Sequence, residues 1–576
     1  MTHVPYRLIV LAVLAGSAAA QARSPERVTF PVSITWDVGP GNNVYLVGSH
    51  PDVGSWNPVN AHKLRWTSGN NWTGQVAVQA GTALEYKFIY RNGASNQYCN
   101  GANVVWEGGA NRTTNLPAAD DAPFTGKTIF YYSSWTSATL VTAASNAYPF
   151  TRVGPGRTGG EFLHRVDGVP EEGEPLEFAI NGSLGGVSGW DKPPSGDGWG
   201  AAGNYYTTLD VFLLQDGQLY SYWPSNTVSV PSSETRVVNS SYSTITGRTI
   251  RIYLPRGYTN HLWKRYPVIY MQDGQNMADP ANPGGSGSWQ FDATAARETR
   301  QGRMRETIVV GIDNIPHYRR TEYNPNGDTY PGEVSGLAWD YLRFLVDNVR
   351  PTLDFHYRTL NDPRNTLVGG SSMGGIFSLF AGFETNVFGG VLAMSPAVTR
   401  APNYKAALPG KPKRPLRVYI DTGTDEGGVG PPNQPLGYYW DDPWSAFDSA
   451  MIIGYAPGDN LMMRIGCGHV HNEAAWRARL PDAVRFLLNV RDEPNLLALE
   501  QHPPRLTSFG AAGASAFTTQ QHMLYQWQRS SLDPAGPSWT DEGIAQRETK
   551  PWSNLVVTGS LATAMGFWRV LAQPAP

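Results

Sequence analysis

The chain has 576 residues, 41% hydrophobic and 16% charged, and this length exceeds what one hydrophobic core normally supports, so we expect several domains. The formal net charge is −3 and no cluster of Lys and Arg lies among aromatic residues, which argues against a nucleic-acid partner or a membrane surface. The 62 Gly and 44 Pro residues, with 12% aromatic residues, are typical of turn-rich β modules.

The chain begins with YRLIVLAVLAGSAAAQA, in which one arginine is followed by an apolar stretch and then by small residues. This order is typical of a secretory signal peptide, and the apolar stretch is too short to span a membrane. We assign residues 1–22 to it, with cleavage near Ala20 or Ala22. The alternative is an apolar first core helix. We therefore expect a soluble secreted protein, either extracellular or periplasmic.

Residues 27–117 contain short alternating runs, VTFPVSITW, NVYLVGS, TGQVAVQ and LEYKFIY, which predict an antiparallel β-sandwich. Three motifs, VYLVGSHPDVGSWNP, LEYKFIYR and VVWEGGANRTTNLP, resemble the starch-binding module that ends many glucoamylases and cyclodextrin-forming amylases. The resemblance implies that Trp56 and Trp106 stack on sugar rings and that Lys87 donates to a sugar hydroxyl. An aromatic face suits the C–H face of glucose. The alternative is that these tryptophans belong to the core, as we expect for Trp72.

Residues 126–224 contain TIFYYSSWTSATLVT, LEFAINGS, GWDKPPSG and NYYTTLDVFLLQDGQLYSYWP, which predict a second β-sandwich. They resemble, more loosely, other bacterial starch-binding modules with a Tyr-rich first strand and a Trp-Asp and Asn-Tyr signature, although the gap in that signature is longer here. The resemblance implies that Trp190 is a sugar platform, with Phe150 or Trp135 beside it or in structural roles. The alternative is a β linker domain that spaces its neighbours.

Residues 235–493 alternate between strands, such as YPVIYMQDG and LRVYIDTG, and helices, which predicts a largely parallel sheet covered on both faces. Within them LVGGSSMGGIFSLF fits G-x-S-x-G, with Ser372 at its centre between a buried strand and a helix. That context is typical of a nucleophile elbow. The flanking glycines, Gly370 and Gly374, are expected because a Cβ at either position would crowd the sharp turn.

Two further strand ends carry candidate partners for Ser372. Asp425 and Glu426 follow the strand LRVYIDTG, and His469 and His471 follow the strand MMRIGCG. The order of serine, acid and histidine is that of α/β hydrolases, and the carboxyl ends of parallel strands lie on one rim of the sheet. The residues therefore predict a catalytic triad, with either carboxylate and either histidine.

Four motifs, VIYMQDGQN, GGSSMGG, DTGTDEG and HNEAAWRARLPDAVRFL, resemble the esterase D-like α/β hydrolases, which include feruloyl, acetyl-xylan and siderophore esterases and mycolyltransferases. The resemblance implies that His471 is the base and that Glu426 is the acid, with Asp425 as the close alternative, and it leaves Asp421 a structural role. The backbone N–H groups of Met373 and Gln275 are the expected oxyanion donors. No metal or organic cofactor is expected.

Residues 502–574 return to β-like alternation and predict a small accessory β module, to which we assign no ligand. Cys99 and Cys467 lie in different predicted domains, so we do not expect them to form a disulfide.

The chain is thus predicted to have two N-terminal antiparallel β-sandwich modules, an α/β-hydrolase domain and a small C-terminal β module. The predicted function is that of a secreted serine esterase acting on acyl esters, bound to starch or a related α-glucan. The alternatives are an acyltransferase to sugar hydroxyls and a starch-binding protein with an inactive hydrolase domain.

Overall fold

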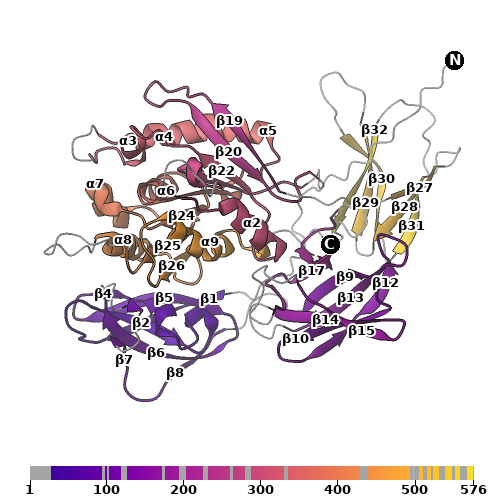
Figure 1. Cartoon of the computed structure of the whole chain (residues 1–576), viewed down its shortest axis with the longest axis horizontal. Coiled ribbons are helices and arrows are strands. Elements are labelled where there is room, and N and C mark those ends of the chain that lie inside the picture. The colour runs from indigo at the N-terminus through magenta and orange to yellow at the C-terminus, as the bar shows by residue number, and fades with distance from the viewer. Residues whose placement is uncertain are drawn as a thin grey trace.

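In the computed structural model, β-rich regions flank a layered α/β region (Figure 1). The predicted signal peptide lies outside the described residues. The structure describes residues 27–93, 98–99, 103–117, 126–170, 176–193, 203–224, 231–259, 264–278, 287–329, 335–426, 438–492 and 497, and the backbone of the strands between 505 and 574. We call residues 27–117 the first β region, residues 126–224 the second β region and residues 235–493 the α/β region.

The first β region consists of two antiparallel sheets that share one core. One sheet has the order β1-β5-β4, and the other has the order β3-β2-β6-β7 with β8 beside β6. Trp72 is 5% exposed and packs in this core, as predicted, with apolar residues from both sheets. The strands are β1 (Arg27–Thr35), β2 (Asn42–Gly48), β3 (His62–Lys63), β4 (Arg65–Thr67), β5 (Asn71–Gln79), β6 (Ala83–Asn92), β7 (Val105–Trp106) and β8 (Arg112–Asn115).

The second β region also has two sheets around an apolar core. Their orders are β12-β13-β9-β17-β18 and β11-β10-β14-β15, with β16 beside β14. The expectation of purely antiparallel pairing is wrong at one place, because β17 runs parallel to β9. The long chain segment between these two strands leaves room for the crossover that parallel pairing needs. The strands are β9 (Lys127–Ser133), β10 (Ser137–Thr142), β11 (Ala147–Pro149), β12 (Thr151–Pro155), β13 (Phe162–Val169), β14 (Leu176–Leu184), β15 (Val187–Asp191), β16 (Tyr205–Thr207), β17 (Val211–Gln215) and β18 (Gln218–Tyr220).

The α/β region is built on an eight-stranded sheet, which confirms the predicted architecture. Its order is β19-β20-β22-β21-β23-β24-β25-β26; β19 and β20 pair antiparallel, and the strands from β22 to β26 pair parallel. The strands are β19 (Ser232–Val238), β20 (Arg248–Leu254), β21 (Val268–Gln272), β22 (Ile308–Ile312), β23 (Thr366–Ser371), β24 (Gly390–Met394), β25 (Arg417–Gly423) and β26 (Leu461–Gly466).

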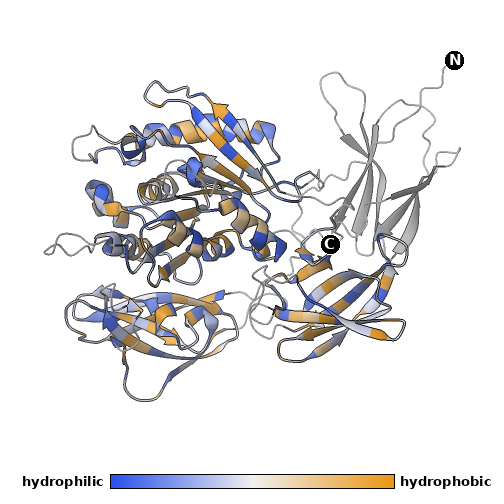
Figure 2. Cartoon of the chain, viewed as in Figure 1, coloured by the Kyte–Doolittle hydropathy of each residue, from blue (hydrophilic) through white to orange (hydrophobic). Residues whose placement is uncertain are grey.

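Helices bury both faces of this sheet (Figures 1 and 2). Alternate residues of β21 belong to two different apolar clusters, Tyr270 on one face and Ile269 on the other, which explains why the parallel strands are continuously apolar. The helices are α2 (Phe291–Arg300), α3 (Arg319–Tyr323), α4 (Ala338–Phe344), the π-helix η5 (Leu345–Val349), α5 (Arg350–His356), α6 (Met373–Glu384), α7 (Pro402–Ala407), α8 (Tyr438–Ile453) and α9 (Glu473–Leu487).

The first β region packs directly on α8 and β26. Tyr98 and Trp440 lie in one apolar cluster, their ring centroids 5.4 Å apart, and the indole of Trp440 donates to the Gly93 carbonyl at 2.6 Å. The Nζ of Lys63 lies 2.7 Å from a carboxylate oxygen of Asp448. These contacts join two regions that are far apart in the sequence.

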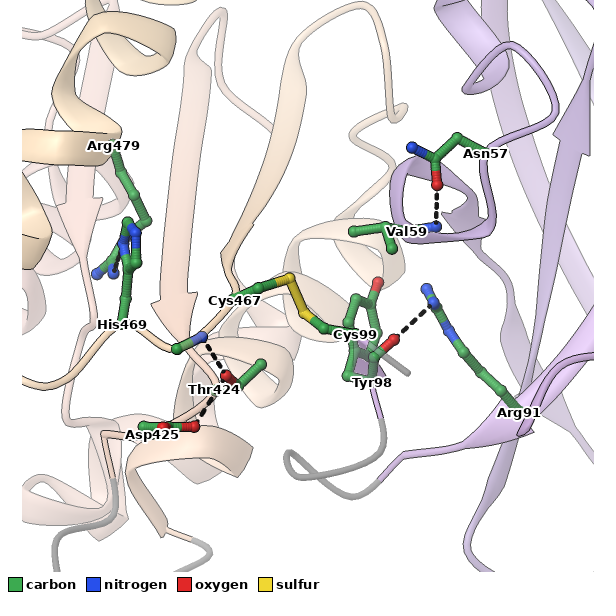
Figure 3. The surroundings of a disulfide bond; sticks show 11 residues. Asn57, Val59, Arg91, Tyr98, Cys99, Thr424, Asp425, Cys467, His469 and Arg479 are labelled. Atoms are coloured by element: carbon green, nitrogen blue, oxygen red, sulfur yellow. Dashed lines mark hydrogen bonds between the residues drawn. A yellow bond between two sulfur atoms is a disulfide. The ribbon is translucent and has the colours of Figure 1, made fainter. Parts of the chain in front are cut away.

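At this interface Cys99 and Cys467 form a disulfide, with their Cα atoms 5.9 Å apart (Figure 3). The expectation that they would not pair is wrong. It treated separation into domains as separation in space, whereas the packing of the first β region on β26 brings the two thiols together. Arg91 supports the Cys99 turn, because its guanidinium lies 3.6 Å from the Tyr98 ring centroid and donates to the Tyr98 carbonyl.

The second β region is joined to the α/β region through buried polar contacts. Glu306 accepts from the Tyr222 hydroxyl at 2.6 Å and from Arg256 at 3.0 Å, and Thr207 donates to the Gly302 carbonyl at 2.9 Å.

Near the C-terminus, strands form two three-stranded antiparallel sheets, β27-β28-β31 and β30-β29-β32. These strands are β27 (Arg505–Phe509), β28 (Ser515–Gln520), β29 (Met523–Ser530), β30 (Trp539–Arg547), β31 (Trp552–Val557) and β32 (Phe567–Pro574). Within the described part of the chain, we find no helix with the length and apolarity that crossing a membrane requires.

Candidate functional site

Ser372 occupies the turn between β23 and α6. Its backbone is strained, with φ 57° and ψ −117°, in a region that side chains other than glycine rarely adopt. Such strain costs about 1–3 kcal/mol and persists only where the surroundings impose it. Here the Ser372 N–H donates to the Met394 carbonyl at 2.9 Å, and its own carbonyl accepts from the Gly375 and Ile376 N–H groups. The turn therefore holds the serine at the carboxyl end of the parallel sheet.

The two glycines that flank Ser372 have the steric role expected of them. A Cβ on Gly370 would lie 2.8 Å from the Gly374 backbone, and a Cβ on Gly374 would lie 3.1 Å from the Cβ of Gln272. The first contact would force the backbone to shift, and the second is so tight that Gln272 would have to give way. The turn around Ser372 thus closes on itself and against the end of β21.

His471 and Glu426 lie together at the same rim. The imidazole Nδ1 of His471 is 2.9 Å from Oε2 of Glu426, which is 4% exposed. The His471 ring also packs against the rings of Tyr439 and Trp476, at centroid distances of 4.3 and 4.9 Å. These contacts fix the orientation of the imidazole. In the neutral tautomer that carries its proton on Nδ1, that proton points at the carboxylate and the lone pair is on Nε2.

The other two candidates for the acid and the base lie elsewhere. The exposed side chain of Asp425 accepts from the Thr424 hydroxyl at 3.0 Å, while its N–H donates to the His469 carbonyl at 3.0 Å. The Nδ1 of His469 faces the Arg479 guanidinium at 3.2 Å. Because a guanidinium only donates, Nδ1 of His469 is an acceptor there, and burial and the charge of Arg479 lower the pKa of His469.

A buried polar network supports Glu426 from behind, and sequence reasoning missed most of it. Oε1 of Glu426 accepts from the Ser395 hydroxyl at 2.5 Å, from the Gly423 N–H at 2.7 Å and from Arg479 at 3.0 Å. The same Ser395 hydroxyl oxygen accepts from the Trp476 indole at 2.8 Å. The only signal in the sequence was the polar character of Ser395 and Arg479 beside apolar runs, and such residues are common on surfaces.

The predicted oxyanion donors lie on adjacent segments. Met373 is the first residue of α6, so its N–H has no acceptor within the helix. Gln275 lies in the short helix η4 (Gly274–Asn276), where the first internal bonds come from the N–H groups of Asn276 and Met277. Since a Cβ on Gly374 would lie 3.4 Å from Oδ2 of Asp273, the two segments are neighbours. The segments that carry the two N–H groups are therefore adjacent.

Two contacts hold the η4 segment in place. Arg319 donates twice to Asp273, at 2.7 and 2.8 Å, and the Asn276 amide donates to Glu473 of α9 at 3.1 Å. Glu473 lies two residues beyond His471 in the sequence. The segment with Gln275 is therefore tied to the helix that follows His471.

Trp56 and Trp106 form a tilted pair on the first β region. Their ring centroids are 6.4 Å apart at an interplanar angle of 42°, and Trp106 is 40% exposed. The Lys87 ammonium donates to the Glu107 and Gly109 carbonyls at 3.0 and 2.6 Å, which leaves one of its three N–H groups. Lys87 thus fixes the turn after Trp106, beside an accessible aromatic surface.

Trp190 is 55% exposed on the second β region, at the edge of a shallow hollow of ≈ 380 Å³ that Trp135, Lys192 and Asp216 also line. The Trp135 ring packs against Gly182 of β14, where a Cβ would lie 1.4 Å from the ring. Phe150 is half-buried against the core of this region. Among these three aromatic residues, Trp190 alone is exposed.

Residues 241–487 match the family model described as "Putative esterase", and residues 25–123 match the one described as "Starch binding domain". The chain contains an esterase region and a starch-binding region. We use these names for the two matched segments. Ser372, Glu426 and His471 all lie in the esterase region, and Trp56, Lys87 and Trp106 all lie in the starch-binding region.

Several known proteins are similar to parts of the chain. An alpha-amylase from Streptomyces violaceus is 38% identical over 91 residues, which are 16% of this chain and 14% of that protein. A cyclomaltodextrin glucanotransferase from Paenibacillus macerans is 39% identical over 83 residues, 14% of this chain and 10% of that protein. The chain thus spans a small part of the length of these curated relatives. A solved ferulic acid esterase from Anaeromyces mucronatus is 19% identical, with a TM-score of 0.33 over 47% of this chain and 95% of that chain.

Among the described residues of both regions, no group of three or more His, Cys, Asp or Glu side chains is arranged to hold a metal ion. The esterase region instead brings a serine, a carboxylate and an imidazole to one rim. The disulfide connects the starch-binding region to the loop between β26 and α9, which is the loop that carries His471. The two regions therefore meet beside the candidate site.

Proposed function

We propose that the chain is a serine esterase that hydrolyses acyl esters and is bound to starch or a related α-glucan. The observation that carries the proposal is the 2.9 Å contact between Nδ1 of His471 and Oε2 of the buried Glu426, at the sheet rim where Ser372 sits in a strained turn. A serine, an imidazole and a carboxylate that orients the imidazole form the arrangement that activates a hydroxyl for attack on an acyl carbon. Here Ser372 is half-buried at the same rim of the sheet as His471 and Glu426. The match of residues 241–487 to an esterase family supports the same chemistry.

The proposed reaction has two halves. Ser372 Oγ attacks the ester carbonyl while Nε2 of His471 takes its proton, and Glu426 stabilises the imidazolium that forms. His471 then gives this proton to the leaving alcohol, so that an acyl-serine remains. In the second half, His471 activates a water that releases the acid and restores the serine. Glu426 is the proposed acid because it, and not Asp425, faces the imidazole.

The negative charge that develops on the carbonyl oxygen needs donors in place before the reaction. We assign this role to the N–H groups of Met373 and Gln275, which lie on neighbouring segments without acceptors in their own helices. Each such donor contributes about a hundredfold or more to the rate. The bonds of Arg319 to Asp273, and of Asn276 to Glu473, stabilise the Gln275 segment.

The starch-directed half of the proposal is supported by the family match of residues 25–123 and by the aromatic surface of Trp56 and Trp106. Flat rings stack on the apolar faces of glucose units, and the remaining N–H of Lys87 can donate to a sugar hydroxyl. Trp190 is a second proposed platform, since its ring is exposed beside Lys192 and Asp216. The proposed substrate is an acyl ester on or near the polysaccharide.

Export from the cytoplasm belongs to the same proposal. A disulfide between Cys99 and the exposed Cys467 persists in oxidising compartments and is rare in the cytosol. The predicted signal peptide at residues 1–22 points to the same compartment.

A panel of nitrophenyl and feruloyl esters, assayed in solution and with granular starch, tests the proposal. We expect hydrolysis by the wild type and, in Ser372→Ala, loss of about a thousandfold or more with unchanged starch binding. Ser371→Ala is the matched control, because Ser371 is the buried last residue of β23 and should be dispensable for the chemistry. Retention of more than a small fraction of activity in Ser372→Ala would contradict the mechanism.

The same assay separates the alternatives. Acylated maltooligosaccharide, detected by mass spectrometry when the sugar is added, would indicate acyl transfer instead of hydrolysis. Starch binding without turnover of any ester would indicate a binding protein with an inactive hydrolase domain.

A further inference from the structure

Arg479 of α9 lies behind the proposed acid and is 2% exposed. Its NH2 nitrogen is 3.0 Å from Oε1 of Glu426, 3.1 Å from Oδ1 of Asp421 and 3.0 Å from the Ser395 hydroxyl oxygen. Its NH1 nitrogen donates to Nδ1 of His469 at 3.2 Å. A single guanidinium therefore contacts the ends of β24 and β25, the acid turn and the loop before α9.

Arg479 offsets part of the negative charge in this cluster. Asp421 and Glu426 are both buried, and two carboxylates that share a dry site repel each other. Burial raises the pKa of Asp421, and the neighbouring charge of Glu426 adds to that effect while Arg479 opposes it. Arg479 is the cation that hydrogen-bonds to both carboxylates.

We propose that Arg479 is a positioning residue for catalysis: it pairs with the buried Glu426 carboxylate and keeps it aimed at His471, although it touches neither substrate nor the reacting atoms. The inference rests on the proposed esterase function. Oε1 of Glu426 is held by Arg479, Ser395 and Gly423, so Oε2 is left to pair with His471. The carboxylate can then stabilise the imidazolium in each half of the reaction.

Loss of Arg479 should therefore change the acid side of the pH profile. Without the cation, Glu426 and Asp421 favour sharing a proton, and when both are ionised their combined charge favours protonated His471. Either effect means that the active form appears only at higher pH. The titratable and charged groups that face the cluster are Tyr419 and Asp421 on β25, Glu426, His469 and His471 in the loops, and Glu473 and Arg479 on α9.

The test measures kcat, KM and the pH dependence of kcat/KM on a nitrophenyl ester. In Arg479→Met we expect kcat to fall by about a hundredfold with KM nearly unchanged, because the imidazole loses its alignment. The acid limb should move up by about one pH unit or more. Arg479→Lys keeps the charge and should retain an acid limb near that of the wild type, with an intermediate kcat. Arg464→Met is the control. Arg464 is exposed on β26, the edge strand of the sheet, and pairs with Asp482.

A charge-balance variant distinguishes this role from a purely structural one. Asp421→Asn removes one of the two carboxylate charges, so it should move the acid limb to lower pH, and Arg479→Met with Asp421→Asn should bring the limb back near the wild-type position. A purely structural Arg479 predicts that the double variant is at least as impaired as Arg479→Met. If Arg479→Met fails to fold, the acid limbs of Asp421→Asn, Arg479→Lys and the double variant still test the role of Arg479.

The proposal is overturned if Arg479→Met folds with the wild-type profile, if Asp421→Asn leaves the acid limb unmoved, or if the double variant keeps the shift of Arg479→Met. Ser372→Ala, assayed on the same ester, separates the two proposals. Wild-type activity in Ser372→Ala would contradict the proposed function itself. If Ser372→Ala is inactive but folded Arg479→Met keeps the wild-type pH profile, only the proposed role of Arg479 is contradicted.

Discussion

Cys99 of the starch-binding region is covalently bonded to Cys467, the residue that begins the loop leading to His471 in the esterase region. This loop is also bonded to the acid turn, because the Gly468 N–H donates to the Thr424 hydroxyl at 2.8 Å and the Asp425 N–H donates to the His469 carbonyl at 3.0 Å. The disulfide therefore fastens the starch-binding region to the loop and turn that carry the proposed base and acid.

The double variant Cys99→Ser with Cys467→Ser should remain folded but be less stable. The bond joins residues 368 positions apart, and loss of such a cross-link typically costs about 2–4 kcal/mol of unfolding free energy. The apolar contacts of Tyr98 and Trp440 should keep the two regions together. We would compare thermal unfolding with and without dithiothreitol. The reductant should lower the wild-type Tm towards that of the variant and leave the variant unchanged. Two free thiols in the oxidised wild type would contradict the bond.

The two adjacent carboxylates of the acid turn should differ sharply in their effect on activity. Glu426→Gln removes the charge that faces His471, and loss of the corresponding charge in a serine triad costs about ten-thousandfold in kcat. Asp425→Asn alters an exposed side chain and should leave kcat within a small factor of the wild type. Steady-state kinetics on one nitrophenyl ester would measure both. A larger loss in Asp425→Asn would reassign the acid.

The elbow was predictable from the sequence because its signal is local. Gly370, Ser372 and Gly374 lie within five positions, and the steric reason for the glycines acts within the turn itself. The pairing of Glu426 with His471 could not be predicted from local signals, since the residues alone allowed either of two carboxylates as the acid and either of two histidines as the base. The resemblance to a family favoured the pair that the structure places in contact.

Other features depend on contacts that join distant segments, and the sequence carries no local signal for them. Arg479 meets Asp421 only because α9 packs across the carboxyl ends of β24 and β25. The disulfide depends on how the starch-binding region docks on α8 and β26, and the residues of that interface, such as Tyr98 and Trp440, look like ordinary core aromatics in the sequence. The parallel pairing of β9 with β17 likewise depends on a crossover that strand patterns do not reveal.

Glu473 should make the stability of the protein depend on pH. Burial raises its pKa in the folded state, and the charge of Asp273 adds to this effect. The pKa of Glu473 is higher in the folded state than in the unfolded state. Protonation of Glu473 therefore stabilises the folded wild type at low pH, and this stabilisation is lost as the pH rises through the folded-state pKa. Glu473→Gln can still accept from Asn276 but carries no charge. Its Tm relative to the wild type should therefore increase from pH 4 to pH 8.

The control for this experiment is Glu85→Gln, which neutralises an exposed carboxylate on β6. The difference between Glu85→Gln and the wild type should vary little over the same pH range. A constant Tm difference between Glu473→Gln and the wild type would show that the buried carboxylate is not perturbed in the folded protein.

The two proposed sugar platforms should act together on a starch surface. Trp106 and Trp190 are 40% and 55% exposed and lie on separate β regions. If both regions contact one granule, the second contact forms at a high effective concentration, so the pair should bind about tens to hundreds of times more tightly than either region alone. Trp106→Ala or Trp190→Ala alone should weaken binding moderately, whereas the double variant should be nearly released.

Depletion from a starch slurry would measure binding, beside hydrolysis of a small soluble ester in free solution. Hydrolysis should be unchanged in all three variants, because neither ring lies in the esterase region that holds Ser372 and His471. Val187→Ala is the matched control, since Val187 is 74% exposed on β15 with Trp190 and offers no ring for stacking. Unchanged depletion in the double variant would show that these rings do not bind the glucan. Loss confined to Trp106→Ala would restrict starch binding to the first β region, where the tilted pair with Trp56 provides the aromatic surface.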